Sequence, residues 1–280
     1  MKKHALIAAN IAAPGGADRR TKSDRHGVPD LASKLSHLPQ RRSRAAWRDH
    51  EYVRGWGVFG LPFDSGHVLA LRVFPDNDFS PYRTLWHRDP DGQWSIYVDG
   101  ARLETACPRY YGPACAHTGF ARIDVRWTGP ASLHVTMDAP RLEWALEAYE
   151  TPLLHAINAV SSRMPLWTWR YATLLRGREI LAKQVLAMGD VRMSGTMPSG
   201  HFGTLMPQRM YFIDTATAIL NGRDLGRPTI EKANPRIGDV TLPARGVLAI
   251  GQAMWEILDA GEYARMRAQT QDDVPTRVPD

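Results

Sequence analysis

Residues 83–99 read RTLWHR-DPDG-QWSIYVD, and this stretch decides the fold class. Two runs rich in β-formers flank Asp89-Pro-Asp-Gly92, where proline at the second position and glycine at the fourth suit a type I turn. Strands joined by so short a turn are typical of a meander or barrel rather than of β-α-β units. The stretch therefore predicts a β-hairpin within an antiparallel sheet.

Further strand signals surround this hairpin. Residues 67–74, HVLALRVF, are apolar on both faces of a strand apart from the ends and Arg72. Residues 122–127 and 132–137 alternate polar with apolar side chains around the turn sequence TGPA, so they predict a second hairpin with one wet face. Because barrel closure is the usual way to remove sheet edges, we expect a closed or nearly closed barrel whose lumen can hold one apolar ligand.

Residues 151–187 change the pattern from strand to helix. Thr151 stands at a cap position with proline just inside, and apolar residues follow at helical spacing as far as Met164. A second helix is predicted at about 168–187. We expect this inserted helical pair to cover the outer face of strand 67–74, since that face is apolar as well.

Strand signals return at 190–194, 209–214 and 217–220, before the turn dipeptide Asn221-Gly222. Residues 244–268 predict a helix, although three glycines weaken it. The expected fold class is α+β and mainly antiparallel β: a β-barrel with an inserted helical pair and a C-terminal helix.

The basic charge is concentrated at the start of the chain. Of the net charge of +6, residues 1–50 carry eleven Lys and Arg against four Asp, or +7, which leaves −1 for the remainder. This segment has few aromatic residues and cannot bury enough apolar surface to offset its ordering entropy. We therefore expect a flexible basic arm at 1–45, a single domain at 46–270 and a disordered tail at 271–280. No interleaved aromatic, zinc or helix-turn-helix pattern supports nucleic-acid binding by the arm.

The first residues, MKKHALIAANIAA, combine a charged start with an apolar run, but Asn10 interrupts the run, which is at the short limit for a signal peptide. We expect a cytoplasmic protein without a transmembrane segment. The sequence is compatible with a homo-oligomer. Cys107 and Cys115 predict two buried or half-buried thiols, with a local disulfide as the alternative.

Three motifs resemble one known family. GWGVFG at 55–60, FSPY at 79–82 and RWTG at 126–129 look like the first barrel of the lipocalin-like carotenoid 1,2-hydratase superfamily, also called hydroxyneurosporene synthases. The resemblance covers residues 52–145 at most. It implies a lipocalin-like calyx that binds a long apolar or terpenoid molecule, with cofactor-free hydration, isomerisation or cyclisation as the chemistry.

Standard signatures of catalysis and of nucleotide or metal binding are absent from the sequence, so we expect neither cofactor nor metal. The best candidate stretch is 195–211, whose three glycines and two prolines predict a loop. In it, His201 is a candidate general acid or base and Arg209 a candidate anion holder. The alternative is that His201 satisfies loop backbone groups while Arg209 lies at a sheet edge. Glu143, beside an aromatic residue, is either a carboxylate of raised pKa or a solvated strand-end residue.

Other candidates are aromatic or imidazole side chains. Strand alternation sends Tyr82 and Trp86 to one face and His87 to the other, so Tyr82 and His87 share a pocket only across a bulge. Residues 166–170, LWTWR, present two indoles that either cap the barrel, dock a partner subunit or rest on a membrane surface. The candidate ligand-binding residues are Tyr82, Trp86, His87, Tyr110, Tyr111 and Tyr211.

These observations favour a cofactor-independent enzyme of the hydratase, isomerase or cyclase type that acts on a hydrophobic terpenoid- or lipid-like molecule. The alternative is a non-catalytic carrier of an apolar ligand. A carrier needs only an apolar cavity, whereas an enzyme needs at least two ionisable groups within reach of one bound atom.

Overall fold

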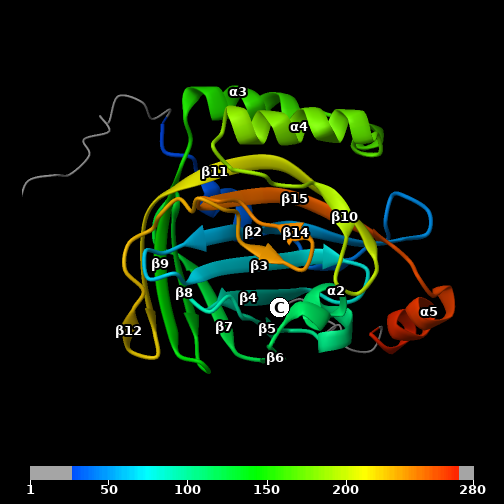
Figure 1. Cartoon of the computed structure of the whole chain (residues 1–280). Coiled ribbons are helices and arrows are strands. Elements are labelled where there is room, and N and C mark those ends of the chain that lie inside the picture. Colours follow the sequence, from blue (N-terminus) through cyan, green and yellow to red (C-terminus); the bar gives the residue numbers. More distant parts are fainter. Residues whose placement is uncertain (1–26, 271–280) are drawn as a thin grey trace, which may run out of the picture.

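The computed structural model describes residues 27–270, and its dominant element is one long curled sheet of mostly antiparallel strands (Figure 1). The strands of the main path, in order across the sheet, are β6 (His117–Phe120), β5 (Trp94–Asp99), β4 (Tyr82–Arg88), β3 (Val68–Asn77), β2 (His50–Pro62), β15 (Val247–Glu256), β11 (Phe202–Leu220), β9 (Leu142–Tyr149), β8 (Ser132–Met137) and β7 (Ile123–Trp127). The two predicted hairpins are confirmed as β4–β5 and β7–β8. The turn at Asp89 closes as expected, because the Gly92 N–H donates to the Asp89 carbonyl over 3.0 Å.

Short elements complete the architecture. The short strands are β1 (Arg41–Arg42), β10 (Ser194–Thr196) and β12 (Arg223–Asp224), which pair with the main sheet, and β13 (Arg236–Ile237) and β14 (Val240–Thr241), which pair with each other. The helices are α1 (Leu31–Leu35), α2 (Pro108–Tyr111), α3 (Pro152–Ser161), α4 (Ala172–Gln184) and α5 (Ala260–Gln269), with 3₁₀ turns η2 (Leu103–Thr105), η3 (Gly112–Ala114) and η4 (Leu166–Trp169).

Two glycines of the paired strands β2 and β15 permit close backbone approaches to the next strand on either side. Gly55 lies opposite Gly251 in this pair. A Cβ atom on Gly55 would lie 1.9 Å from the carbonyl oxygen of Val73, and one on Gly251 would lie 2.3 Å from that of Met206. Only glycine permits backbones to approach so closely, and both glycines lie at shifts of the strand register, between β2 and β3 and between β11 and β15.

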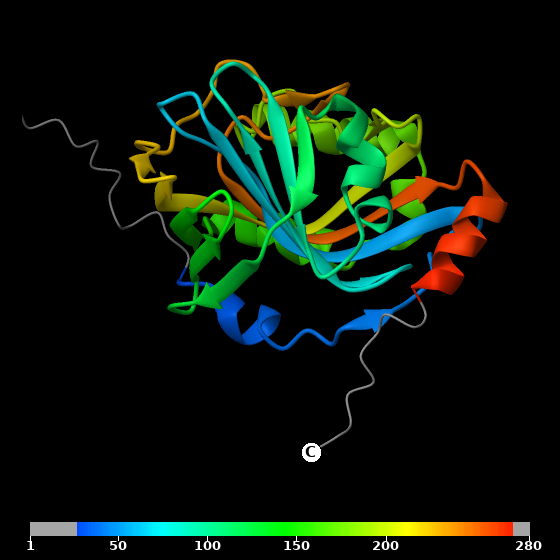
Figure 2. The same ribbon diagram turned by 90° about the horizontal axis from the view of Figure 1, so that it is seen from below.

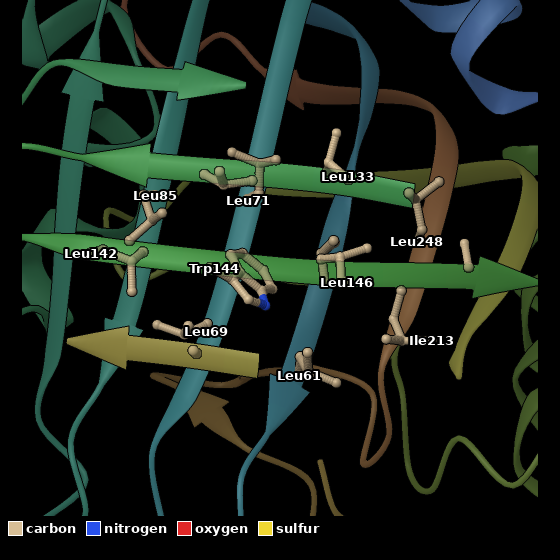
Figure 3. Close-up of a cluster of buried hydrophobic side chains, with 14 of the residues drawn as sticks. Leu61, Leu69, Leu71, Leu85, Leu133, Leu142, Trp144, Leu146, Ile213 and Leu248 are labelled. Atoms are coloured by element: carbon tan, nitrogen blue, oxygen red, sulfur yellow. The ribbon is translucent and has the colours of Figure 1, made fainter. Parts of the chain in front are cut away.

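The central strands are buried on both faces and so support two separate cores. On β3, Leu69 and Leu71 face a core in which β7, β8 and β9 pack across β2 to β4, and Trp144 of β9 lies at its centre (Figure 3). We call this the closed core. Val68 and Ala70 face a second core beneath α2 and the residues near β13 and β14, which we call the pocket core (Figure 1).

The two edges of the sheet approach each other without a continuous strand ladder. The Ile123 N–H of β7 donates to an Asp99 carboxylate oxygen of β5 over 3.1 Å. Pairing within the main path ends at β6 on one side and at β7 on the other. The observed architecture is therefore a curled half-barrel. It agrees in its coarse features with the predicted α+β, barrel-like fold class.

The beginning of the described chain is packed against the sheet (Figure 2). Leu31 and Leu35 of α1 are buried in the closed core, and the Leu31 N–H donates to the Pro130 carbonyl over 2.8 Å. Further along, β1 pairs with β3. Residues 31–42 are thus docked rather than free, although the sequence places them in the basic arm, whereas residues 1–26 of that arm lie outside the described residues.

The predicted helix at 244–268 is wrong for its first half. Residues 247–256 form β15, which lies between β2 and β11, and a helix begins only at Ala260. Val247, Leu248 and Ala249 are all buried because β15 is covered on both faces, and such a continuous apolar run cannot be told from a buried helix by periodicity.

The inserted helices exist but cover different strands from those predicted. Leu154 of α3 and Ala182 of α4 pack in one cluster with Phe212 of β11 and Val247 of β15. Figure 1 shows the two helices above these strands. Thr151 caps α3, since its side chain accepts a hydrogen bond from the Leu154 N–H. The second apolar face of β3 is instead covered by α2 and by the segments that complete the pocket core.

Candidate functional site

An apolar pocket opens in the pocket core, between the sheet and the segments that cover it. The space that admits a water-sized sphere is about 50 Å³. By the same measure a single water needs roughly 10–15 Å³, so the enclosed part holds only a few non-hydrogen atoms. Much of the wall is aromatic or aliphatic, and includes Phe59, Phe74, Trp86, Tyr111, Leu242 and Trp255.

Arg72 is the one residue of the pocket wall that carries a formal charge at neutral pH. Strand β3 places its side chain on the pocket face, and the residue is only 5% exposed. The guanidinium donates to the carbonyls of Val58 and Leu71 over 2.5 and 3.0 Å, and to that of Phe59 over 3.3 Å. It also lies over the rings of Phe59 and Trp86, at 4.0 and 5.1 Å from their centroids.

No carboxylate of the described residues forms an ion pair with Arg72. Burial lowers the pKa of its guanidinium to about 10, which still leaves the group charged at neutral pH. A buried charge is costly unless it is paired, and backbone carbonyls and aromatic faces neutralise it only in part. Three of the five N–H groups of the guanidinium are used by these carbonyls. Within the described part of the chain, the pocket therefore presents a positive charge without a counter-charge at an apolar wall.

The other polar groups around Arg72 are neutral. Desolvation by burial raises the pKa of the Cys107 thiol and that of the Tyr111 hydroxyl. Burial also raises the pKa of Tyr82, whose hydroxyl lies 3.7 Å from the Cys107 sulfur. Thr84 donates to the same sulfur over 3.6 Å. These groups remain protonated at neutral pH, so they offer hydrogen-bonding hydroxyl and thiol groups rather than a general base.

A buried ionic network supports one wall of the pocket. Glu51 is 0% exposed and accepts from the Arg109 Nε over 3.0 Å and from the terminal nitrogen over 2.8 Å. Tyr110 also donates to Glu51, while its ring stacks on that of Trp255 with centroids 4.0 Å apart. Arg109 further contacts Glu262 of α5 over 3.2 Å. The network thus fixes α2 and Trp255 relative to each other.

His201 lies next to this network. Its Nδ1 is 2.7 Å from the Ser199 hydroxyl, its ring packs edge-on against Tyr110, and its Nε2 is buried without a partner among the described residues. Desolvation by burial lowers the pKa of His201, so its imidazole ring is uncharged at neutral pH. The predicted loop is shorter than 195–211, because β10 ends at Thr196 and β11 already begins at Phe202.

The other two predicted catalytic residues do not join His201. Arg209 lies on β11 opposite Ile250, two residues before Tyr211, which is buried in the closed core. Glu143 is 47% exposed at its side chain and pairs with Arg141 over 2.9 Å. The structure therefore distributes these candidates over different faces of the sheet instead of around one bound atom.

The predicted ligand-binding residues divide between the same faces. Trp86 and Tyr111 line the pocket, and Tyr82 lies in the pocket core close behind them. His87 instead lies 2.8 Å from His67 through ring nitrogens, as the predicted alternation along β4 requires. Burial lowers the pKa of His87 to about 4. Within residues 27–270 no group of three or more His, Cys, Asp or Glu residues is placed to hold a metal ion.

Two further features are the cysteines and a groove beside α4. Cys107 and Cys115 are both free thiols. The groove has a volume of about 1340 Å³ and lies between α4 and the strands β10 and β14. Its charged side chains have both signs, and Lys183 pairs with Asp190 over 2.5 Å. The groove therefore shows no preference for a ligand of one charge.

Sequence reasoning missed the two buried charges that shape the site. Arg72 stood out as the lone charged residue inside an apolar strand, and that interruption is a signal that could have marked it. Glu51 gave no such signal, because its partner Arg109 is 58 residues away in the chain.

No family model, no curated protein and no solved structure matches the chain. The resemblance to the carotenoid hydratase superfamily therefore stays a prediction. None of the described helices is both long enough and apolar enough to cross a bilayer.

Proposed function

We propose that this protein binds a small apolar molecule with one negatively charged group, and that Arg72 receives this group. The observation that carries the proposal is the buried guanidinium at the wall of an apolar pocket, which has no carboxylate partner within residues 27–270. A ligand carboxylate there would neutralise the charge, and hydrogen bonds to charged groups in such surroundings contribute about 1.5–3 kcal/mol each.

The size of the enclosed space restricts the ligand. About 50 Å³ accommodates a carboxylate and the first few carbons of an aliphatic or aromatic acid, whereas the rest of a longer molecule would extend beyond the pocket. The proposal keeps the apolar ligand class that the lipocalin-like resemblance implies. It places the charged end of that ligand in the pocket core rather than in a barrel lumen, since side chains of the closed core fill the space between the two walls of the sheet.

Binding without catalysis is the better-supported version of this function. An enzyme would need two ionisable groups at one reacting atom, but Cys107 and Tyr111 are held in their neutral, protonated forms. His201, Arg209 and Glu143 do not converge on the pocket. A carrier or sensor of an organic acid requires only the apolar wall and the fixed charge of Arg72.

The test compares acids with alcohols of the same chain length. Butyrate, hexanoate, butanol and hexanol are titrated against the full chain, with thermal stabilisation and tryptophan fluorescence as readouts, because Trp86 and Trp255 line the pocket. We expect the acids to bind at least about tenfold more tightly than the alcohols, because an alcohol lacks the hydrogen bond between a carboxylate and the Arg72 guanidinium. Equal binding of acid and alcohol would contradict the proposal.

Two variants make the test specific to the site. Arg72→Met removes the charge and retains an apolar side chain, so it should abolish the preference for the acid. Arg126→Met removes a charge whose side chain is 73% exposed on β7, and it should leave binding unchanged. If both variants bind hexanoate as the natural chain does, the acid binds elsewhere and the pocket assignment fails.

A further inference from the structure

The region that contains α3, η4 and α4 has an unusually apolar exterior. Fourteen large hydrophobic side chains of the described residues are exposed, and eight of them lie between residues 153 and 185. We call these eight residues the helical surface: Leu153, Val160, Trp167, Tyr171, Leu174, Ile180, Leu181 and Val185. Large exposed apolar side chains concentrated in one stretch of the chain in this way mark an interaction site.

The helical surface is not explained by packing on the sheet. In α4, Leu175 and Ala182 are buried and define the inner side of the helix. Ile180 is five residues after the first of these and two before the second, which places it on the opposite side of the helix, and it is 62% exposed. A helix that only covers a sheet carries polar residues at such a position.

Aromatic residues lie at the point where η4 leads into α4. Trp167 and Tyr171 are 59% and 56% exposed, and their rings form an edge-to-face pair with centroids 5.9 Å apart. Trp and Tyr side chains are enriched where protein meets the headgroup region of a bilayer, because one end of each is apolar and the other is polar.

The charge of this region distinguishes between classes of partner. Residues 151–187 contain five Arg and Lys, of which Lys183 is paired with Asp190 over 2.5 Å; the other four are balanced by only one acidic residue of this stretch, which leaves a net charge of +3. That acidic residue, Glu179, accepts a hydrogen bond from the Met193 N–H over 2.7 Å and so is engaged within the protein. Two copies joined through this region by a two-fold axis would bring these positive charges close to each other. Such repulsion disfavours a second copy as the partner and favours an anionic one.

We propose that the helical surface binds to the surface of an anionic lipid bilayer. The exposed apolar side chains enter the headgroup region while Arg170 and Arg176 contact lipid phosphates, in the manner of interfacial amphipathic helices. Apart from Ile180, which also lines the groove beside α4, these apolar side chains line neither the pocket nor the groove, and a fluid lipid surface accepts such projections without a matching shape. This proposal rests on the helical surface alone and does not depend on the ligand pocket.

Vesicle flotation with the full chain tests the proposal. Vesicles of phosphatidylcholine alone are compared with vesicles that contain phosphatidylglycerol as well, at low and at high salt. We expect binding only to the anionic vesicles and weaker binding at high salt, because salt screens surface charges. Ile180→Ser should reduce the binding about tenfold through the loss of an inserted side chain. Arg176→Gln should reduce it about fivefold.

Matched variants on other parts of the surface control for general stickiness. Leu258→Ser and Arg126→Gln change side chains that are also exposed but lie outside the helical surface, and both should leave flotation unchanged. Absence of binding to anionic vesicles would overturn the proposal. Equal binding to neutral vesicles would overturn it as well. A third contradicting outcome is a protein that does not bind vesicles but forms a dimer by light scattering, which Ile180→Ser dissociates.

Discussion

The two faces of β3 and β4 show how one set of strands serves two purposes. Leu69, Leu71 and Leu85 point into the closed core, which holds apolar side chains throughout (Figure 3). Only one residue away in each strand, Arg72 and Trp86 point into the pocket core, where charge, thiol and hydroxyl groups remain beside an apolar space. The difference teaches that stability and ligand recognition are divided by strand alternation, so substitutions on the two faces should have separable effects.

The largest effect should come from the centre of the closed core. Trp144 is fully buried, so Trp144→Ala should lower the free energy of unfolding by about 3–5 kcal/mol through lost contacts and the cavity that remains. Urea unfolding measures this loss. Trp167→Ala, at a 59% exposed position, is the control and should change stability by less than about 0.5 kcal/mol. A loss below about 1 kcal/mol at Trp144 would mean that this core is not tightly packed.

The next largest loss of stability is expected on the pocket side of the sheet, where a buried charge needs an opposite charge beside it. Glu51→Gln retains the shape of the side chain but leaves the Arg109 guanidinium without its buried counter-charge. We expect a loss of about 3 kcal/mol in unfolding free energy, at the low end of the range for broken buried pairs, because Glu262 still contacts Arg109.

The same variant should also affect the pocket. Tyr110 joins Glu51 to Trp255, so weakening the network releases one wall of the binding site. Hexanoate affinity should therefore fall for Glu51→Gln but remain unchanged for the folded fraction of Trp144→Ala. The reverse result would show that the two faces are not separable.

The fold was predictable from sequence where local chemistry determines the structure. The turn at Asp89 to Gly92 and the cap at Thr151 are encoded by adjacent residues, and both form as expected. Strand β15 was not predictable in this way. Its burial on both faces depends on pairing with β2, almost 200 residues earlier in the chain, and such pairing leaves no periodic signal.

The candidate site was predictable only in part, for a related reason. The alternation of β4 correctly separated Tyr82 and Trp86 from His87. The role of Arg72 depends on what surrounds it, however, and an isolated arginine in a strand is equally compatible with an ion pair on the opposite wall. The absence of that partner among the described residues is a property of the assembled fold.

A pH-dependent effect comes from the histidine pair beside the closed core. Burial and the neighbouring His67 lower the pKa of His87 from its ordinary value near 6.5 to about 4, so the folded state favours the neutral ring. The stability that this contributes is fully present above pH 6.5 and is lost as pH falls from 6.5 to 4. The loss should be on the order of 3 kcal/mol.

Urea unfolding between pH 7.5 and 4.5 measures this dependence. His87→Gln should flatten the curve over that interval, because glutamine does not titrate. His37→Gln replaces an exposed histidine and should leave the curve unchanged. Identical pH dependence in the natural chain and in His87→Gln would rule out the pair as the source.

The smallest change in stability, and the sharpest contrast with Glu51, is expected at Arg72. Arg72→Met removes a buried charge that has no carboxylate partner in the described structure. It also removes three hydrogen bonds to carbonyl groups, which offsets part of the gain. The ligand-free protein should therefore become more stable by about 1–2 kcal/mol or keep the same stability. The same variant should lose its preference for hexanoate over hexanol. A group retained at a cost to stability is explained by ligand binding, whereas destabilisation by more than about 3 kcal/mol would identify the guanidinium as a structural element of the pocket core.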